Sequence, residues 1–158
     1  IEMKNVERVT VKSKQYYHFL RARTESETAA YRPGMYEKRE EEHGWMMNLY
    51  KEWHVGDAAS TEMIARRYIE RFIGCVENIT NPKCDMSAKE KKQEIKNMLA
   101  NPRVGKMART AKPRSLYMKI MLLPIKWNST LLTYWEAKVI TYVKTKNTKL
   151  FTKLKVGR

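Results

Sequence analysis

The clearest hydrophobic pattern in the chain lies between residues 58 and 79. Apolar residues recur there every three or four positions, as on the buried face of an α-helix: Ile64, Tyr68, Phe72, Cys75, Val76 and Ile79. Charged residues occupy the opposite side, and Asn81-Pro82 follows as a stop. The pattern predicts an amphipathic helix whose apolar face packs into a core.

A helix is also expected before this one, from residue 35 to a stop at Gly56. Four residues have the spacing of its buried face: Met46, Leu49, Tyr50 and Trp53. Residues 37–42 carry four glutamates with Lys38 and Arg39, which is typical of a solvated helix face with ion pairs between successive turns. An acid–base centre would need two of these carboxylates in a pocket, so we favour the solvated face.

Capping signals predict further helices after residue 81. Ser87 and Glu90 have the spacing of a capping box, in which each side chain binds the other residue's backbone amide. That helix is expected to bury Ile95, Met98 and Leu99, and a short helix through Val104 and Met107 follows Asn101-Pro102. Another helix runs from Lys112-Pro113 to Pro124, and a last one starts near Ser129 with an apolar stripe of Leu132, Trp135, Val139 and Val143.

The first 33 residues have a different pattern. Residues 6–12 alternate between apolar and polar side chains, and residues 16–20 form a short aromatic run, so we expect a two-strand β remnant. Pro33-Gly34 marks a loop after it. The predicted fold is therefore mainly α: a helical domain of five or six helices over residues 34–158, after a short β segment in residues 1–33.

Positive charge is concentrated in the second part of the chain. The net charge is +15, and residues 102–158 hold 14 Lys and Arg against the single Glu136, which gives +13. Such a surplus favours an anionic partner: a membrane surface, a nucleic acid or another anionic polymer.

Lysines alternate with large apolar residues from Ser115 to Val143, as in helices that lie on anionic membranes. The expected contacts are Lys119, Lys126 and Lys138, with Lys144, Lys146, Lys149, Lys153 and Lys155 of the basic tail. The same alternation occurs in core helices whose lysines extend along the apolar surface to reach water, so this alternative stays open. Interleaved aromatic and cationic residues also suit single-stranded nucleic acid, but the aromatics fall on apolar stripes and are expected in the core.

The sequence offers no complete catalytic or metal centre. His43 and His54 are too far apart along a helix to bind one ion, so no metal site is expected from the three histidines. Neither a glycine-rich phosphate loop nor a Ser/His/Asp arrangement is present. Cys75 and Cys84 are expected as free thiols in a reducing compartment, and Cys75 as a core residue.

One polar constellation follows the aromatic run. Arg21, Arg23 and Ser26 come directly after residues 16–20, at spacings that could bring two guanidinium groups and a hydroxyl to one anionic group. This stretch resembles the end of the catalytic domain in bacterial family 2 glycosyltransferases of the GT-A type. Segments similar to the C-terminal tails of such enzymes in Gram-positive bacteria are residues 66–74, 87–96, 101–104 and 112–116.

The resemblance implies sugar transfer from a nucleotide-sugar donor to a glycan acceptor of the cell surface. It places an Asp-x-Asp site for Mg or Mn in a catalytic domain before Ile1, since the only aspartates here are Asp57 and Asp85. Residues 1–33 would then be the end of that domain, with Arg21, Arg23 and Ser26 beside its cleft and His18 as a possible metal-side histidine. No cofactor and no activity are expected of this chain alone.

In this interpretation, residues 34–158 orient the enzyme as a cytoplasmic, peripheral protein at the inner face of the membrane, with self-association as a further possibility. Two alternatives stay open. The basic half could bind nucleic acid, or the helices could serve protein interaction or oligomerisation.

Overall fold

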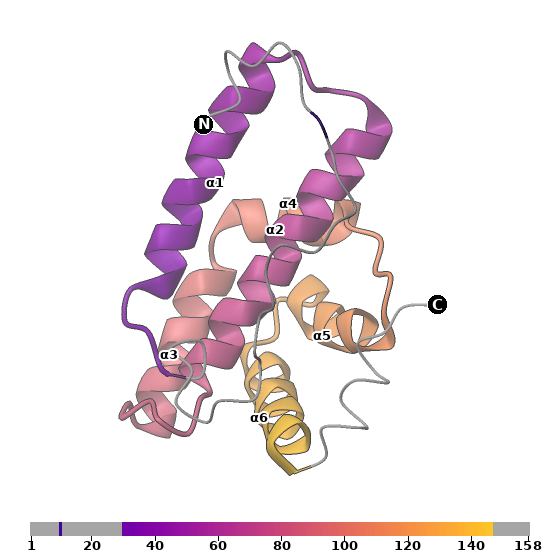
Figure 1. The fold of residues 1–158 in the computed structure, drawn as a ribbon. Helices are drawn as coiled ribbons and strands as arrows, with labels where there is room; N and C mark the ends of the chain where they lie inside the picture. The colour runs from indigo at the N-terminus through magenta and orange to yellow at the C-terminus, as the bar shows by residue number, and fades with distance from the viewer. Residues whose placement is uncertain (1–9, 11–29, 147–158) are drawn as a thin grey trace.

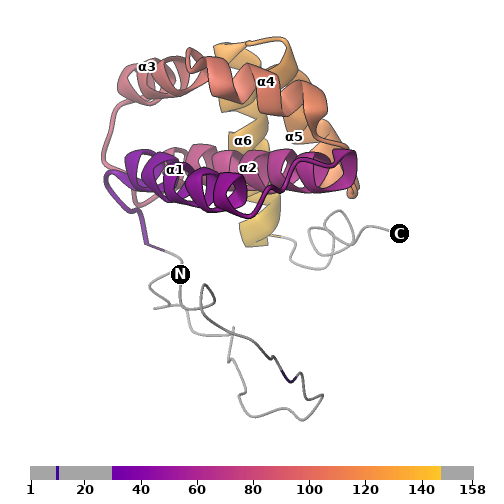
Figure 2. The same ribbon diagram turned by 90° about the horizontal axis from the view of Figure 1, so that it is seen from above.

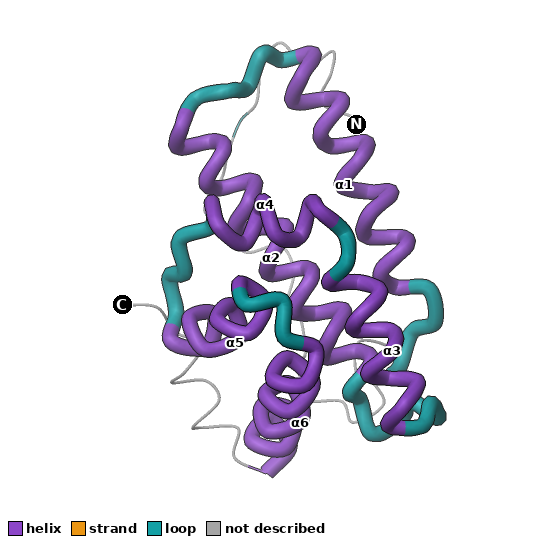
Figure 3. Tube along the Cα trace, turned by 180° about the vertical axis from the view of Figure 1, so that it is seen from behind, coloured by secondary structure: helices purple, strands orange, loops and turns teal. Residues whose placement is uncertain are grey.

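The computed structural model describes residue 10 and residues 30–146, and this part is mainly helical, as predicted (Figure 1). Its six helices are α1 (Met35–Glu52), α2 (Ala58–Ile79), α3 (Ala88–Leu99), α4 (Pro102–Thr110), α5 (Leu116–Lys126) and α6 (Thr130–Lys146). The helices are joined by short loops, and no strand occurs in these residues (Figure 3). The expected β remnant lies outside the described residues, except for residue 10.

Helix α2 is the centre of the arrangement. Seen from above, α1 and α2 lie side by side as one layer, with α3 and α4 in a second layer (Figure 2). Helix α2 contacts each of the other five helices, and α5 and α6 also contact each other. The core therefore forms around α2.

The apolar stripe predicted for α2 is confirmed. All six of its predicted members are buried, and Ala65, Ile69 and Ile73 complete the buried face. Ile69 and Ile73 are among the largest fully buried side chains of the core. Burial of side chains of this size is worth about 1.5–3 kcal/mol each, so this face is a major source of stability.

Local signals in the sequence set most helix boundaries. The Ser87 hydroxyl accepts a hydrogen bond from the Glu90 backbone amide at 3.3 Å, and the Glu90 carboxylate accepts one from the Ser87 backbone amide at 2.7 Å. These two bonds confirm the capping box. Asp57 caps α2 by accepting the Ser60 amide at 2.9 Å. At the start of α1, Gly34 has a φ of +66°, a conformation that glycine adopts without strain.

The prediction for the face of α1 was only partly correct. Leu49 is buried and Met46 and Tyr50 are half-buried, but Trp53 is exposed. Helix α1 ends at Glu52, four residues before Gly56, because His54 takes a left-handed φ of 52° and breaks the helical hydrogen-bond pattern.

Two expectations about the last helices were wrong. Helix α5 continues through Pro124 to Lys126, where we expected it to end at the proline. On α6 the expected stripe faces outward, since Leu132, Trp135 and Val139 are exposed and Val143 is only partly buried. The buried face instead comprises Thr133, Tyr134, Ala137 and Ile140.

The size of the side chains explains this choice of face. Ala137 and Thr133 are fully buried and small, so the α6 backbone can approach α3 and α5 closely. The buried Thr133 hydroxyl donates to the Ser129 carbonyl at 2.8 Å, which removes the cost of an unpaired polar group. The large side chains lie on the other face, where no described helix covers them.

A pair of substitutions tests which face of α6 is buried. Ala137→Leu adds volume to a fully buried position, and we expect a loss of about 1–3 kcal/mol in the free energy of unfolding. Val139→Ala, on the exposed face, should change it by less than about 0.5 kcal/mol. Urea denaturation of both variants measures this; the opposite ranking would restore the stripe predicted from the sequence.

Candidate functional site

The outward side of α6 is an apolar surface. Five large side chains are exposed on it: Leu131, Leu132, Trp135, Val139 and Tyr142. Apart from the adjacent Leu131 and Leu132, successive members are three or four residues apart, which places all five on one side of the helix; we call this side the α6 face. Trp135 and Val139, near its middle, are 57% and 58% exposed. Such a row is costly in water, which makes the α6 face a candidate contact site.

Exposed lysines occur on both α5 and α6. The predicted contacts Lys119, Lys126, Lys138, Lys144 and Lys146 are all exposed. Leu116 and Leu123 on α5 and Trp127 directly after it add exposed apolar groups close in sequence to Lys119 and Lys126. The other three predicted contacts, Lys149, Lys153 and Lys155, lie outside the described residues.

The individual lysines differ in their surroundings. The Lys138 ammonium lies 5.6 Å from the ring centroids of both Tyr134 and Trp135, so cation–π attraction holds it on the α6 face. Lys144 pairs with Glu77 on α2 at 3.5 Å. Lys138 is therefore joined to the apolar surface through Trp135, whereas Lys144 holds α6 against α2.

Glu136 is the one acidic residue between Ser115 and Lys146. Its side chain is half-buried, and its Oε2 atom is buried without a hydrogen-bond partner in the described part of the chain. Burial raises the pKa of this carboxyl above its ordinary value, because the charged form loses hydration. Glu136 is therefore the single carboxyl in this segment that can oppose the lysines, and it is partly withdrawn from solvent.

The tryptophans correct a prediction from the sequence. We expected the aromatics in the core, but all four tryptophans are exposed: Trp45, Trp53, Trp127 and Trp135. The core is filled mainly by Ile, Met, Leu, Val and Ala, with Tyr68, Phe72 and Tyr134 as its buried rings. Helical spacing alone could not reveal this, because α6 carries apolar residues on both of its sides.

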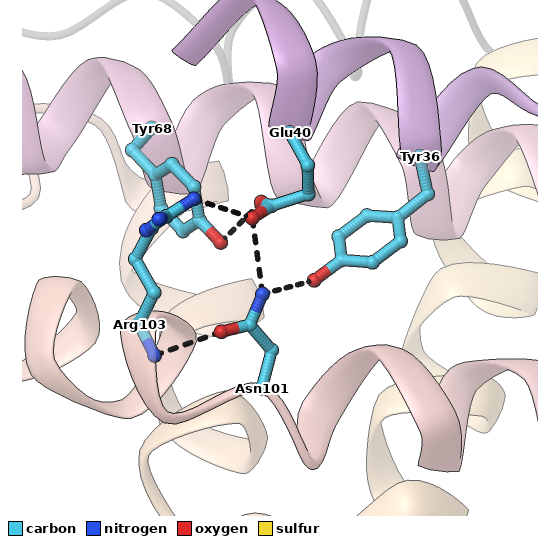
Figure 4. A network of polar contacts seen from close by, with 5 residues as sticks. All are labelled: Tyr36, Glu40, Tyr68, Asn101 and Arg103. Carbon is cyan, nitrogen blue, oxygen red and sulfur yellow. Dashed lines mark hydrogen bonds and ion pairs between the residues drawn. The ribbon is translucent and has the colours of Figure 1, made fainter. Parts of the chain in front are cut away.

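A second cluster of functional groups surrounds Glu40 (Figure 4). Tyr68 on α2 donates its hydroxyl proton to Glu40 Oε1 at 2.6 Å. Asn101 and Arg103, at the start of α4, donate to Glu40 Oε2 at 3.0 and 2.8 Å. Asn101 also donates to the Tyr36 hydroxyl at 2.9 Å and accepts the Arg103 amide at 3.0 Å. This Glu40 network joins α1 to α2 and to the start of α4.

The Glu40 network has the contacts of a structural clasp. Both carboxylate oxygens are engaged, and burial together with the hydrogen bond to Glu40 raises the pKa of Tyr68 far above its ordinary value. The neighbouring cavity is about 10 Å³, roughly the space of one water molecule, which leaves no room for a substrate. The sequence predicts a solvated helix face for residues 37–42. Glu40 is an exception, because its carboxylate binds side chains that are 28 to 63 residues away in sequence.

Other reactive side chains are equally shielded. Both cysteines are free thiols and Cys75 is a core residue, as predicted, and Cys84 is buried as well. Burial raises the pKa of Cys75 to about 12, so it is protonated at neutral pH. The described residues contain no group of His, Cys, Asp or Glu side chains able to hold a metal ion. The predicted site residues His18, Arg21, Arg23 and Ser26 lie outside the described residues.

Comparison of the chain with known protein families, with curated proteins and with solved structures gave no match. Among the residues that the structure describes, no helix has both the length and the apolar character needed to cross a membrane.

Loss of the Glu40 charge should weaken the fold. Glu40→Gln keeps the side-chain size but replaces the charged acceptor of Arg103, Asn101 and Tyr68, and we expect a loss of about 1.5–3 kcal/mol in the free energy of unfolding. Glu41→Gln, an exposed neighbour on the same turn, is the matched control and should change it by less than about 0.5 kcal/mol. Equal effects of the two substitutions would contradict a clasp at Glu40.

His43 should make stability depend on pH. Its ring is buried against Tyr68, with ring centroids 4.7 Å apart, and Nε2 has no partner in the described part. Burial and then the charge of Arg103 lower its pKa, so the unfolded chain binds the proton more readily and stability falls as the pH drops through about 6.5.

The measurement is the melting temperature between pH 7 and pH 5 for wild type and His43→Leu. The variant should gain relative to wild type as the pH falls, because it has no imidazole to protonate on unfolding. His54→Asn changes an exposed histidine and is the control, with the wild-type slope expected. Parallel curves for wild type and His43→Leu would refute the assignment.

Proposed function

We propose that this helical module binds an anionic membrane surface through the α6 face and thereby holds its parent protein at the membrane. The observation that carries the proposal is the row of exposed Leu131, Trp135 and Val139 with Lys138 on the same helix. Aliphatic and indole groups gain free energy by leaving water for the headgroup–acyl boundary. Lysines beside them meet the phosphates of anionic lipids.

Binding of single-stranded nucleic acid is the nearest alternative, because exposed tryptophans and lysines suit base stacking. The composition of the α6 face favours the membrane. Leu131, Leu132 and Val139 have no ring to stack on a base, whereas each gains from contact with hydrocarbon.

Self-association through the α6 face is less favoured on grounds of charge. Protein interfaces are depleted in lysine at their centres. A symmetric dimer would bring two copies of the same basic surface together, including Lys126 and Lys138 from each copy, with only the half-buried Glu136 in opposition.

The parent activity that we propose is glycosyl transfer to a cell-surface glycan, from a nucleotide-sugar donor with Mg or Mn in the catalytic domain. It rests on the resemblance of residues 16–28 and of the helical segments to family 2 glycosyltransferases. Its test is whether the coding sequence before Ile1 specifies an Asp-x-Asp after a strand, and whether purified protein with that domain transfers sugar while this chain alone does not.

Substitution of Trp135 tests the membrane proposal. Trp135→Ala removes a large apolar group from the α6 face, and affinity for vesicles of phosphatidylglycerol and phosphatidylcholine should fall by about 1.5–3 kcal/mol, or roughly 10- to 100-fold. Trp45→Ala on α1 removes an equally exposed tryptophan and is the matched control, with no change expected. Lys138→Gln should cost about 1 kcal/mol at low salt and less at high salt.

The assay is vesicle flotation, with a random single-stranded oligonucleotide and size-exclusion chromatography as parallel arms. Binding to vesicles without binding to the oligonucleotide supports the proposal. Equal losses for Trp135→Ala and Trp45→Ala, tight oligonucleotide binding without vesicle binding, or a stable dimer lost in Trp135→Ala would each overturn it.

A further inference from the structure

A hollow between α1 and α2 carries a concentration of arginines. Its volume is about 330 Å³, and it is lined by Met35, Arg39, Arg67, Glu70, Arg71 and Gly74. Arg39 comes from α1, and Arg67 and Arg71 are one turn apart on α2, so two helices bring three guanidinium groups to one open space. We call it the arginine hollow.

Protein carboxylates, including Glu70 in the lining of the hollow, balance these charges only in part. Arg39 and Arg71 share one carboxylate, that of Glu42, at 2.6 and 3.9 Å. Glu70 pairs with Arg66 at 3.6 Å, and Arg66 also meets Glu62 at 3.3 Å. Arg67 makes no ion pair within the described residues, so the hollow keeps a surplus of positive charge.

Arg71 on α2 pairs with Glu42 on α1 and so contributes to the fold, but no described ion pair requires Arg67. Helices α1 and α2 are held together by the Glu40 network and by Tyr36 packed edge-on against Phe72, with ring centroids 6.1 Å apart. Arg67 and Arg71 are like charges one turn apart on α2 and repel each other, so Arg67 costs stability where a neutral side chain would not.

Gly74 lines the hollow without a side chain. A Cβ atom placed on Gly74 would meet no atom within 4 Å, so a larger residue would fit the backbone but would project into open space. Glycine inside a helix costs roughly 0.5–1 kcal/mol relative to alanine, and the packing of α2 does not demand it at this position.

We propose that the arginine hollow is a binding site for a phosphate or diphosphate group. Guanidinium groups present forked pairs of N–H donors that match phosphate oxygens, and such charge-assisted bonds are stronger than neutral ones. The Arg39 and Arg71 side chains are 35% and 43% exposed, so a ligand reaches them from solvent. The site is separate from the α6 face and does not depend on the membrane proposal.

Pyrophosphate is the probe, titrated at constant ionic strength into the full 158-residue chain and followed by amide NMR. We expect saturable shifts centred on Arg67, Arg71 and Gly74. Arg67→Gln and Arg71→Gln should each weaken binding roughly 10- to 100-fold. Arg114→Gln, an exposed arginine outside the hollow, is the charge-matched control and should leave affinity unchanged.

Glycine substitutions separate a bound ligand from general attraction to a basic protein. Gly74→Leu fills the hollow without changing any charge and should abolish saturable binding. Gly44→Leu is its control, since a Cβ at Gly44 also meets nothing within 4 Å. Shifts that rise linearly and spread over all basic residues, or that survive Gly74→Leu, would refute the site.

Vesicles identify the source of the phosphate. If Arg67→Gln weakens pyrophosphate binding but not vesicle flotation, the ligand is a soluble phosphate compound. If it weakens both, the hollow meets lipid headgroups as well. Failure of Trp135→Ala to affect flotation would sink the membrane proposal while leaving the pyrophosphate result as it stands.

Discussion

The arrangement of all six helices depends on the burial of one face of α2. This helix has nine buried residues over six turns, and it contacts each of the other helices. An isolated helix is only marginally stable in water, so α2 and the helices around it stabilise one another through this shared face. The groups with exposed chemistry, on α6 and at the α1–α2 pair, lie on elements whose position α2 fixes.

Features that are encoded locally could be predicted from the sequence. The α2 stripe follows a strict helical period, and the capping box needs only Ser87 and Glu90, three residues apart. The buried side of α6 could not be identified in the same way, because both sides carry apolar residues. The small side chain of Ala137 decides which side packs against the core. The Glu40 network and the arginine hollow depend on contacts between distant segments, which no local pattern contains.

The two sides of the α1–α2 pair show how one pair of helices can combine stability with exposed charge. Toward α4, Glu40 gathers Tyr68, Asn101 and Arg103, and every strong donor there has an acceptor. Asn101 contributes twice, since its side chain also caps α4. Arg39 and Arg71 both pair with Glu42 and also line the small cavity beside Glu40. Arg67 makes no ion pair within the described residues, so the arginine hollow keeps an excess of positive charge.

The same reasoning applies to α6. Its inner face satisfies the core with Thr133, Tyr134, Ala137 and Ile140, so the fold needs nothing large on the outer face. Polar residues there would be more favourable in water, yet the outer face holds Trp135 and Val139 together with a lysine. A protein partner could cover the apolar groups but would have to remove water from the Lys138 ammonium. A membrane interface accommodates the apolar groups and the lysine together. The lysine stem lies along apolar surface, while its ammonium stays hydrated near lipid phosphates. That difference in the cost of desolvation is the physical reason for preferring a membrane as the partner of the α6 face.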